Sequence, residues 1–203
     1  MQHERTYLRH YIPWRDYLVL CKPKVVLLLL VTAWVGMLLA SHSPVITMKM
    51  LLATIGIGFA ANSAAVLNHI IDSRIDAKMQ RTKQRPMVNG RIRTQHALLF
   101  SFILGLTSMV LLIVYVNSLT ALLTLLGIIG YACIYTMFLK HWTSQNIVFG
   151  GLAGALPPLL GWTSITDSIE FEALLLVLII FVWTPAHFWP LAIDRVNDYQ
   201  KAK

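Results

Sequence analysis

Charged side chains are scarce in this sequence. Asp, Glu, Lys and Arg together make up 13% of its 203 residues, whereas apolar residues make up 57%. A soluble globular domain usually has about 25% charged residues, because polar groups must cover its surface. The composition therefore excludes a soluble domain and a disordered tail, and it predicts a protein embedded in a lipid bilayer.

Cysteine is also rare, with only two residues in the chain, Cys21 and Cys133. They lie far apart in the sequence, and neither belongs to a CxxC pattern. Two isolated cysteines cannot form a dense disulfide framework, and their spacing gives no support to a metal or redox site.

Acidic residues are outnumbered by basic ones, nine against 17, which gives a formal net charge of +8. In a soluble protein this excess would suggest a nucleic-acid partner. In a membrane protein, an excess of basic residues instead indicates how the chain is oriented in the membrane, because Lys and Arg gather on the cytoplasmic side. We therefore expect no nucleic acid among the partners.

Six apolar stretches are long enough, or nearly so, to cross a bilayer as helices, which takes about 20 residues. They cover residues 25–40, 50–71, 96–116, 119–139, 147–165 and 171–193. The sequence thus predicts an all-α fold, a polytopic membrane helix bundle with six transmembrane helices. The expected organisation is a cytoplasmic N-terminal segment (1–24), the transmembrane region of a single domain (25–193) and a second cytoplasmic segment (194–203).

An even number of spans places both ends of the chain on the same side of the membrane. With this alternation, every one of the 17 Lys and Arg residues except Lys49 falls on one side. Such an asymmetry is what the positive-inside rule describes. We predict a multi-pass protein of the inner (cell) membrane with both ends in the cytoplasm.

Three polar residues, Asn68, Asp72 and Asp76, follow one another at four-residue spacing where the second span ends. At about 100° per residue, each step of four turns the helix by only about 40°, so the three side chains share one face. Carboxylates one turn apart repel each other, and polar groups inside a membrane are costly. A bound cation explains this face best, and oxygen ligands favour Mg²⁺ or Ca²⁺.

Basic residues follow this face directly, at Arg81, Lys83 and Arg85. Mg²⁺ typically takes one or two carboxylates and completes its shell with water and substrate phosphate. The basic side chains would then neutralise the remaining charge of a diphosphate. The alternative is that all these residues are ordinary charges at a membrane boundary, which the positive-inside rule alone explains.

The sixth span ends in a related pattern, with Asp194 and Asp198 four residues apart and Tyr199 next to them. In the predicted topology this end lies on the same cytoplasmic face as Asp72 and Asp76. Two acidic helix ends on one side could hold a diphosphate through two metal ions.

Two further features leave alternatives open. His187 lies about two turns inside the sixth span, where a histidine can serve as a ligand, a proton carrier or a hydrogen-bonded packing residue. Gly150, Gly151 and Gly154 have the spacing of close helix contacts, and they would also suit the wall of a cavity.

The acidic face and the residues after it resemble a known motif. Asn68-x-x-x-Asp72-x-x-x-Asp76 followed by Met79-x-Arg81-Thr82-x-x-Arg85-Pro86 resembles the first aspartate motif of the UbiA superfamily of intramembrane prenyltransferases. Three more segments resemble one branch of it, the protoheme IX farnesyltransferases (heme O synthases). They are Tyr17-Leu18-x-Leu20-x-Lys22-Pro23, Tyr135-Thr136-x-x-Leu139-Lys140 with Gln145-Asn146-Ile147-Val148-x-Gly150-Gly151, and Thr184-Pro185-x-His187-Phe188-Trp189. The resemblance covers nearly the whole chain.

The resemblance implies an Mg²⁺-dependent enzyme that transfers the farnesyl group of farnesyl diphosphate to the vinyl group of heme B, giving heme O. The residues it implies as catalytic and metal-holding are Asn68, Asp72, Asp76 and Asp198, and those it implies as substrate-binding are Arg81, Lys83, Arg85, His187, Asp194 and Tyr199. His187 matches a histidine associated with the heme acceptor. The implied partners are farnesyl diphosphate, heme B, the lipid bilayer, and heme-handling or oxidase-assembly proteins.

The sequence departs from the family pattern in two residues and in length. Ala186 stands where the family commonly has a second proline, and Asn197 stands where many members have a charged residue. The family continues beyond its second aspartate motif to nine helices. The resemblance therefore implies that residues up to Lys203 correspond to the first two-thirds of such an enzyme.

The sequence is also compatible with other functions. A related prenyltransferase with another aromatic or tetrapyrrole acceptor would keep the same acidic face. CDP-alcohol phosphotransferases also use membrane aspartates, but their DxxDG…GxxxDxxxD pattern does not occur in the sequence. A non-catalytic ion-binding membrane protein is the third alternative, although transporter sites usually lie nearer the bilayer midplane.

Overall fold

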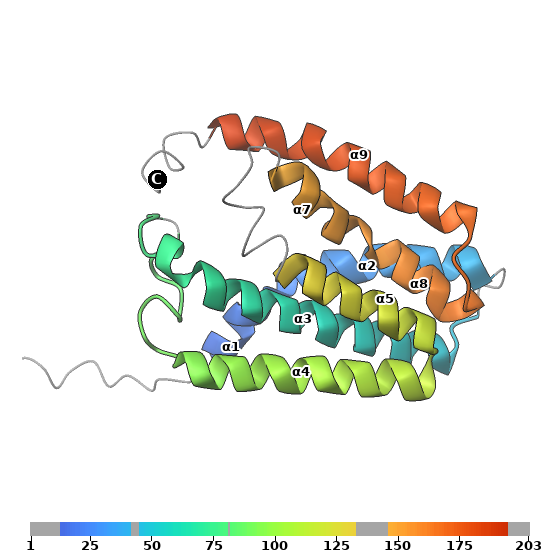
Figure 1. The fold of residues 1–203 in the computed structure, drawn as a ribbon, viewed down its shortest axis with the longest axis horizontal. Coiled ribbons are helices and arrows are strands. Elements are labelled where there is room, and N and C mark those ends of the chain that lie inside the picture. The colour runs from blue at the N-terminus through green and yellow to red at the C-terminus, as the bar shows by residue number, and fades with distance from the viewer. Residues whose placement is uncertain (1–12, 42–44, 81, 133–145, 195–203) are drawn as a thin grey trace, which may run out of the picture.

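The computed structural model describes residues 13–41, 45–80, 82–132 and 146–194, and every regular element in these ranges is a helix. The helices are α1 (Pro13–Cys21), α2 (Pro23–Ser41), α3 (Met48–Asp76), α4 (Thr94–Tyr115), α5 (Ser118–Ile129), α7 (Asn146–Ala155), α8 (Pro157–Thr166) and α9 (Phe171–Asp194). The long helices run side by side along the length of an elongated bundle (Figure 1). Within the described ranges the predicted all-α class is confirmed.

Within the described ranges, four helices are long and apolar enough to cross a membrane. They are α2, α3, α4 and the Phe171–Pro190 part of α9. The predicted span over residues 119–139 coincides, as far as it is described, with a shorter apolar helix, Ser118–Ala132. The chain is therefore a multi-pass membrane protein, whereas the predicted count of six spans is not confirmed.

The predicted span over residues 147–165 is two helices rather than one. α7 ends at Ala155, and Pro157 and Pro158 occupy the first two positions of α8. Proline is tolerated there because the first turn of a helix has no intrahelical partner for its N–H groups, but inside a continuous helix it clashes with the preceding turn. The double proline therefore ends one helix and begins the next.

The segment before the first span contains a helix that the sequence analysis did not predict. α1 buries Leu20 and exposes Trp14 and Leu18, so its two sides differ in environment. Asp16 on α1 is buried and forms an ion pair with Arg91 at 3.2 Å. This pair ties α1 to the connection between α3 and α4.

α3 is the central helix of the bundle and packs against α4, α2, α1, α8 and α5. Its buried positions are mostly small or polar residues, which let the neighbouring helices approach closely. Ser63 Oγ donates to the Ser101 carbonyl at 2.9 Å, and Ser108 Oγ donates to the Gly56 carbonyl at 2.7 Å. These hydrogen bonds fix α4 along α3, in addition to the apolar contacts between the two helices.

α2 and α8 cross so closely that two glycines are required at the contact. A Cβ atom on Gly36 would lie 2.1 Å from the Pro158 carbonyl oxygen, and one on Gly161 would lie 2.0 Å from the Ala33 carbonyl oxygen. Real Cβ atoms do not come this close to backbone, so only glycine permits this crossing. The contact holds α8, and with it α7 and α9, against α2.

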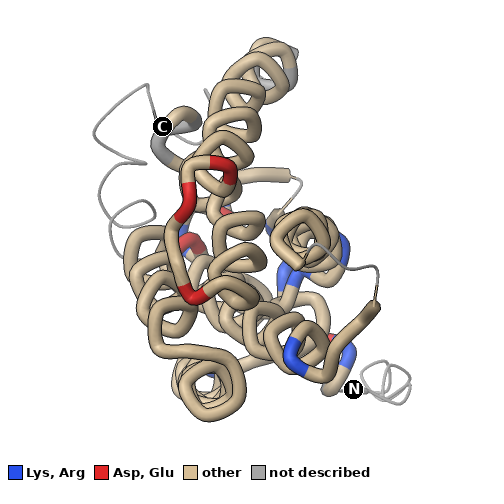
Figure 2. The backbone as a smooth tube through the Cα atoms, turned by 90° about the vertical axis from the view of Figure 1, so that its right-hand side faces the viewer, with Lys and Arg blue, Asp and Glu red and all other residues tan. Residues whose placement is uncertain are grey.

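The two ends of the helix bundle carry different helix termini and different charged residues. α3 and α9 both end at the left of Figure 1, where the connection between α3 and α4 also lies. At the opposite end, Figure 2 shows acidic residues where α8 is followed by α9: Asp167 and Glu170 lie between the two helices, and Glu172 lies in the first turn of α9. The end that carries the C-termini of α3 and α9 is the one with the candidate site.

Candidate active site

The polar face of α3 lies in the last three turns of the helix and is almost fully buried. Asn68, Asp72 and Asp76 expose only 6%, 4% and 5% of their surface. Asn68 Nδ2 donates a hydrogen bond to Asp72 Oδ2 at 2.9 Å. The structure thus brings together the three residues that the four-residue spacing predicts on one face.

Two basic side chains among the described residues contact this face. Arg85 Nη1 forms an ion pair with Asp76 Oδ2 at 2.5 Å. Lys22 Nζ donates to Asn68 Oδ1 at 2.5 Å. Asp76 is therefore paired with a basic residue of the α3–α4 connection, and Asn68 accepts from a basic residue at the corner between α1 and α2.

The connection between α3 and α4 is folded against the end of α3 and is not an open linker. Consecutive turns hold it together, with backbone hydrogen bonds from Lys83 to Met79 and from Asn89 to Arg85. Thr82 is buried, and its hydroxyl donates to the Asp76 carbonyl at 2.9 Å. These contacts fix Arg85 beside Asp76.

Arg91 fastens the far part of the same connection. Its Nη2 donates to the Gln84 carbonyl at 2.9 Å, and its Nη1 pairs with Asp16 of α1. Gly90 has a φ of +66°, which places its backbone in the left-handed region that glycine adopts without strain. The connection therefore closes over the α3 terminus and reaches α1.

A cavity of about 610 Å³ lies between α2, α3, α5, α7, α8 and α9. Its lining on α3 comes from residues 57–65, which precede the polar face along the helix. Its wall is predominantly apolar and contains the aromatic side chains of Tyr131, Trp183 and Phe188. Lys22 lines the cavity and also binds Asn68. The polar face and the apolar cavity are thus adjacent parts of one site.

The glycines of α7 serve both of the roles that the sequence left open. Gly150, Gly151 and Gly154 all line the cavity. A Cβ atom on Gly151 would lie 2.7 Å from Thr184 Cγ2, so this residue also sets the contact between α7 and α9. A Cβ atom on Gly154 would meet nothing within 4 Å, which leaves that position as cavity wall only.

The remaining predicted site residues, where their side chains are described, make no hydrogen bond or ion pair with the polar face, and several lie outside the described ranges. His187 is exposed on α9 and stacks on Trp183, with 4.4 Å between ring centroids and 14° between planes. Lys83 is exposed on the α3–α4 connection, and Asp194 is the last residue of α9. Arg81, Asp198 and Tyr199 lie outside the described residues.

The donor set on α3 suits Mg²⁺ better than a transition metal. Among the described residues, no three His, Cys, Asp or Glu side chains are grouped so that they could hold a metal ion by themselves. Asn68, Asp72 and Asp76 offer one amide oxygen and two carboxylates. Mg²⁺ is commonly bound in this way, through one or two carboxylates with further ligands from water and substrate phosphate.

Lys22 is the site residue that the sequence analysis missed as a candidate. It has a φ of 48°, in the left-handed region that lysine seldom adopts, and it separates α1 from α2. This sharp corner directs Lys22 toward Asn68. The sequence signal was the Lys22-Pro23 pair immediately before the first span, where Pro23 begins a helix.

Sequence comparisons relate most of the chain to membrane prenyltransferases. The model of the UbiA prenyltransferase family matches residues 29–203. A Pseudoalteromonas atlantica protein named protoheme IX farnesyltransferase 2 is 59% identical over 94% of this chain and 62% of its own length. A Legionella pneumophila protoheme IX farnesyltransferase is 56% identical over 95% of this chain and 65% of its own length. The chain thus spans less than two-thirds of the length of these relatives.

Solved structures share the fold at low sequence identity. A UbiA homologue from Archaeoglobus fulgidus, solved with DMAPP and Mg²⁺, superposes with a TM-score of 0.77 at 19% identity, over 92% of this chain and 66% of that one. A structure of digeranylgeranylglyceryl phosphate synthase gives a TM-score of 0.78 at 20% identity, over 94% and 66%. The family match over residues 29–203 and this shared fold lead to one conclusion: the chain belongs to the UbiA prenyltransferase family.

Proposed function

We propose that this chain transfers the farnesyl group of farnesyl diphosphate to the vinyl group of heme B, giving heme O. One observation carries the proposal: Lys22 binds Asn68 and lines the apolar cavity, so the polar face and the cavity meet at one residue. A ligand with an anionic head and a long apolar tail fits such a site. The relatives named protoheme IX farnesyltransferase, at 59% and 56% identity, support farnesyl transfer to heme as the reaction.

The polar end of the site would hold the diphosphate. Asn68, Asp72 and Asp76 are the residues that would hold Mg²⁺, which when bound neutralises phosphate charge and stabilises the departing diphosphate. Lys22 and Arg85 would donate charge-assisted hydrogen bonds to the phosphate oxygens. Arg81 and Lys83 of the same connection would add positive charge around them.

The apolar end would hold the farnesyl chain and keep water away from it. A volume of about 610 Å³ lies within the range of about 300–1,000 Å³ that is usual for small-molecule sites. Tyr131, Trp183 and Phe188 on the wall would attract the allylic cation through their ring faces.

The proposed transfer has three steps, in which every bond and charge is accounted for. The C–O bond between farnesyl and diphosphate breaks, and the electron pair leaves with the diphosphate. The vinyl group of the acceptor forms the new C–C bond to the allylic carbon. Water adds to the resulting cation on the porphyrin side chain and loses a proton, which leaves a hydroxyl group.

His187 is the residue that we assign to the heme acceptor. It stacks on Trp183, which lines the cavity, so an acceptor bound against His187 would lie next to the farnesyl chain. Asp194, Asp198 and Tyr199 would form the second half of the diphosphate site, at the end of α9. This assignment agrees with the position of the α9 terminus at the same end of the bundle as the α3 terminus (Figure 1).

We further propose the inner (cell) membrane as the location, with the ends of α3 and α9 and both chain ends in the cytoplasm. All Lys and Arg residues except Lys49 would then lie on the cytoplasmic side. Residues 25–193 would form the transmembrane region of a single prenyltransferase domain with six membrane crossings, one of them made by α7 and α8 together, and residues 194–203 would begin its second aspartate motif. Proteins that deliver heme B or assemble heme-containing oxidases are the expected partners.

Product analysis with alternative acceptors tests the proposed reaction. Membranes containing this chain are incubated with Mg²⁺, farnesyl diphosphate and either heme B or an aromatic acid, and the products are identified by mass. The Legionella pneumophila relative serves as the positive control. We expect heme B to gain one farnesyl and one hydroxyl group, whereas prenylated aromatic acid without farnesylated heme would assign another acceptor. No product with either would favour the ion-binding alternative.

Filling the cavity should shorten the isoprenoid that the site accepts. Gly154 lines the cavity and has open space around its α-carbon, so Gly154→Phe adds a ring there without a backbone clash. We expect kcat/KM for farnesyl diphosphate to fall about 10-fold or more, and that for dimethylallyl diphosphate to change little. Both are measured by product formation with heme B.

Gly130→Phe is the matched control for this substitution. Gly130 also has open space around it but does not line the cavity. Equal losses for the two variants, or an equal loss for both diphosphates in Gly154→Phe, would show that the farnesyl chain does not occupy this cavity.

A further inference from the structure

The metal-holding residues are occupied by the chain's own groups. Arg85 Nη1 contacts Asp76 Oδ2, and the two side chains are only 26% and 8% exposed. Lys22 Nζ contacts Asn68 Oδ1, and Asn68 Nδ2 in turn contacts Asp72 Oδ2. Each of the three predicted ligands is therefore engaged by another side chain.

A cation that entered alone would have to compete with Arg85 and Lys22. It would approach an Asp76 oxygen that already accepts from a guanidinium, and like charges repel strongly where little water screens them. If the metal displaced Arg85, it would leave a partly buried guanidinium without its carboxylate, which is strongly unfavourable. The structure therefore opposes the binding of a bare divalent cation.

A diphosphate removes this obstacle. Its oxygens offer Arg85 and Lys22 new anionic partners, and Arg pairs well with phosphate because its planar group donates two parallel hydrogen bonds. The α3–α4 connection holds Arg85 at the end of α3 through Thr82, so Arg85 can change partner without leaving the site. Asp76 and Asn68 are then free to accept the metal.

We propose that Arg85 and Lys22 are exchangeable cations that make metal binding conditional on diphosphate. While the site holds no ligand, Arg85 pairs with Asp76 and Lys22 donates to Asn68, and both cations pass to the diphosphate when it binds together with the metal. Metal and diphosphate consequently raise each other's affinity by the same factor, as linkage requires. This inference rests on the proposed function, because it concerns the same diphosphate site.

Mn²⁺ binding measured by electron paramagnetic resonance tests the proposal without any catalytic turnover. The purified chain in lipid nanodiscs is titrated with Mn²⁺ alone and with Mn²⁺ plus inorganic diphosphate, and a buffer blank corrects for the complex formed in solution. For the unmodified chain we expect diphosphate to raise Mn²⁺ affinity about 10-fold or more, within the usual range of coupling. For Arg85→Gln we expect Mn²⁺ alone to bind about 10-fold more tightly than to the unmodified chain. The factor by which diphosphate raises Mn²⁺ affinity should then fall toward one.

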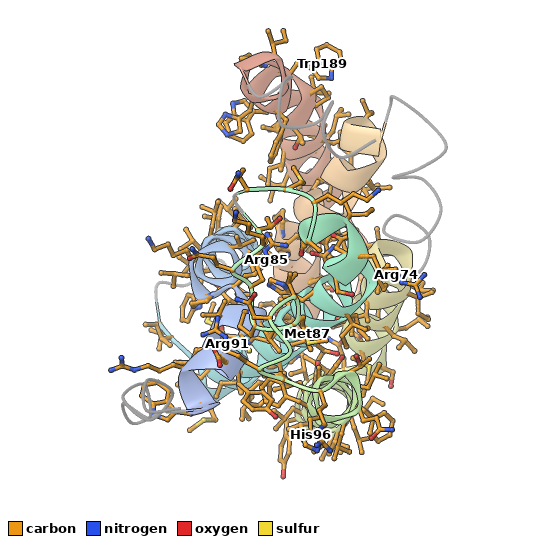
Figure 3. The ribbon with its side chains drawn as sticks, turned by 90° about the vertical axis from the view of Figure 1, so that its left-hand side faces the viewer. Arg74, Arg85, Met87, Arg91, His96 and Trp189 are labelled. Atoms are coloured by element: carbon orange, nitrogen blue, oxygen red, sulfur yellow. The ribbon has the colours of Figure 1, made fainter. Side chains whose placement is uncertain are left out.

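Arg74→Gln is the matched control for the loss of charge. Arg74 is exposed on α3, two residues from both Asp72 and Asp76, and Figure 3 shows it on the opposite side of α3 from Arg85. Because exposed charges are screened by salt, we expect less than about a twofold change in Mn²⁺ affinity. Lys22→Gln removes the cation that contacts Asn68, and the same Mn²⁺ titration is carried out on it. This second variant tests the proposal if Arg85→Gln lowers the yield of folded chain.

Each outcome either supports or overturns the exchange. Tighter binding of Mn²⁺ alone in Arg85→Gln and Lys22→Gln, but not in Arg74→Gln, supports it. Unchanged affinity for Mn²⁺ alone in both variants, or the same gain in Arg74→Gln, overturns the proposed exchange. The proposed function would still stand in that case if farnesylated heme is formed. An unmodified chain that binds no Mn²⁺ with or without diphosphate would overturn both.

Discussion

Replacing Asp72 by asparagine is expected to abolish farnesyl transfer and leave the folded chain in the membrane. Asp72 is buried, and its Oδ2 accepts from Asn68 Nδ2 at 2.9 Å. The substituted amide has nearly the same shape and retains an oxygen that can accept this hydrogen bond, but it has lost the negative charge that a divalent cation needs. Removal of one group that stabilises transition-state charge typically costs about 10²–10³-fold in rate, and we expect a loss at or above the top of this range.

Two measurements separate the loss of charge from a loss of structure. Product mass with heme B reports transfer, and Mn²⁺ affinity in the presence of inorganic diphosphate reports the metal site directly. Asp16→Asn is the control, because Asp16 on α1 is similarly buried but pairs with Arg91 of the α3–α4 connection, away from the predicted metal ligands. This control should lower the melting temperature and keep Mn²⁺ binding. If Asp72→Asn turns over normally, the metal site has been assigned to the wrong residues.

Gly161→Ala should destabilise the whole bundle even though it adds a single methyl group far from the polar face. Its Cβ would lie 2.0 Å from the Ala33 carbonyl oxygen, and backbone cannot rotate away as a flexible side chain can. Overpacking usually costs about 1–3 kcal/mol, and a clash with backbone belongs at or above the top of that range. For a chain of this size we expect the melting temperature to fall by at least about 6 °C.

Thermal unfolding followed by size-exclusion chromatography in detergent measures this effect. Gly58→Ala is the matched control, because its Cβ would lie 3.5 Å from Leu30 Cδ1, an ordinary contact distance. The melting temperature of the Gly58→Ala control should be close to that of the unmodified chain. A Gly161→Ala variant that melts with the control would mean that α2 and α8 do not cross as closely as described.

The polar face of α3 could be predicted because it depends only on local geometry. Asn68, Asp72 and Asp76 lie within one helix, and four-residue spacing fixes their common face whatever surrounds the helix. The same reasoning identified the apolar spans that became α2, α3, α4 and α9, since length and composition suffice to predict them. Features of this kind follow from the sequence of one segment.

The partners of that face could not be predicted, because they come from distant segments. Lys22 and Asn68 are 46 residues apart, and their contact depends on the left-handed corner at Lys22. The ion pair of Arg85 with Asp76 depends on how the α3–α4 connection folds around Thr82. Periodicity within a segment carries no information about such contacts.

The break between α7 and α8 was predictable in principle and was missed. Pro157 and Pro158 interrupt an apolar run whose length alone favours one span. The cavity, in contrast, arises from the packing of six helices, including the close crossing at Gly36 and Gly161. Only the three-dimensional arrangement shows that this cavity adjoins the polar face.

A structure of the chain solved with Mg²⁺ and a non-reactive thio analogue of farnesyl diphosphate would show where the two ends of the substrate bind. We predict that the diphosphate group lies against Asn68, Asp72 and Asp76, with Arg85 turned from Asp76 to a phosphate oxygen. The farnesyl chain should pass Lys22 and enter the cavity toward Trp183. A diphosphate bound elsewhere, or a farnesyl chain that lies outside this cavity, would show that the polar face and the cavity are not the prenyl diphosphate site.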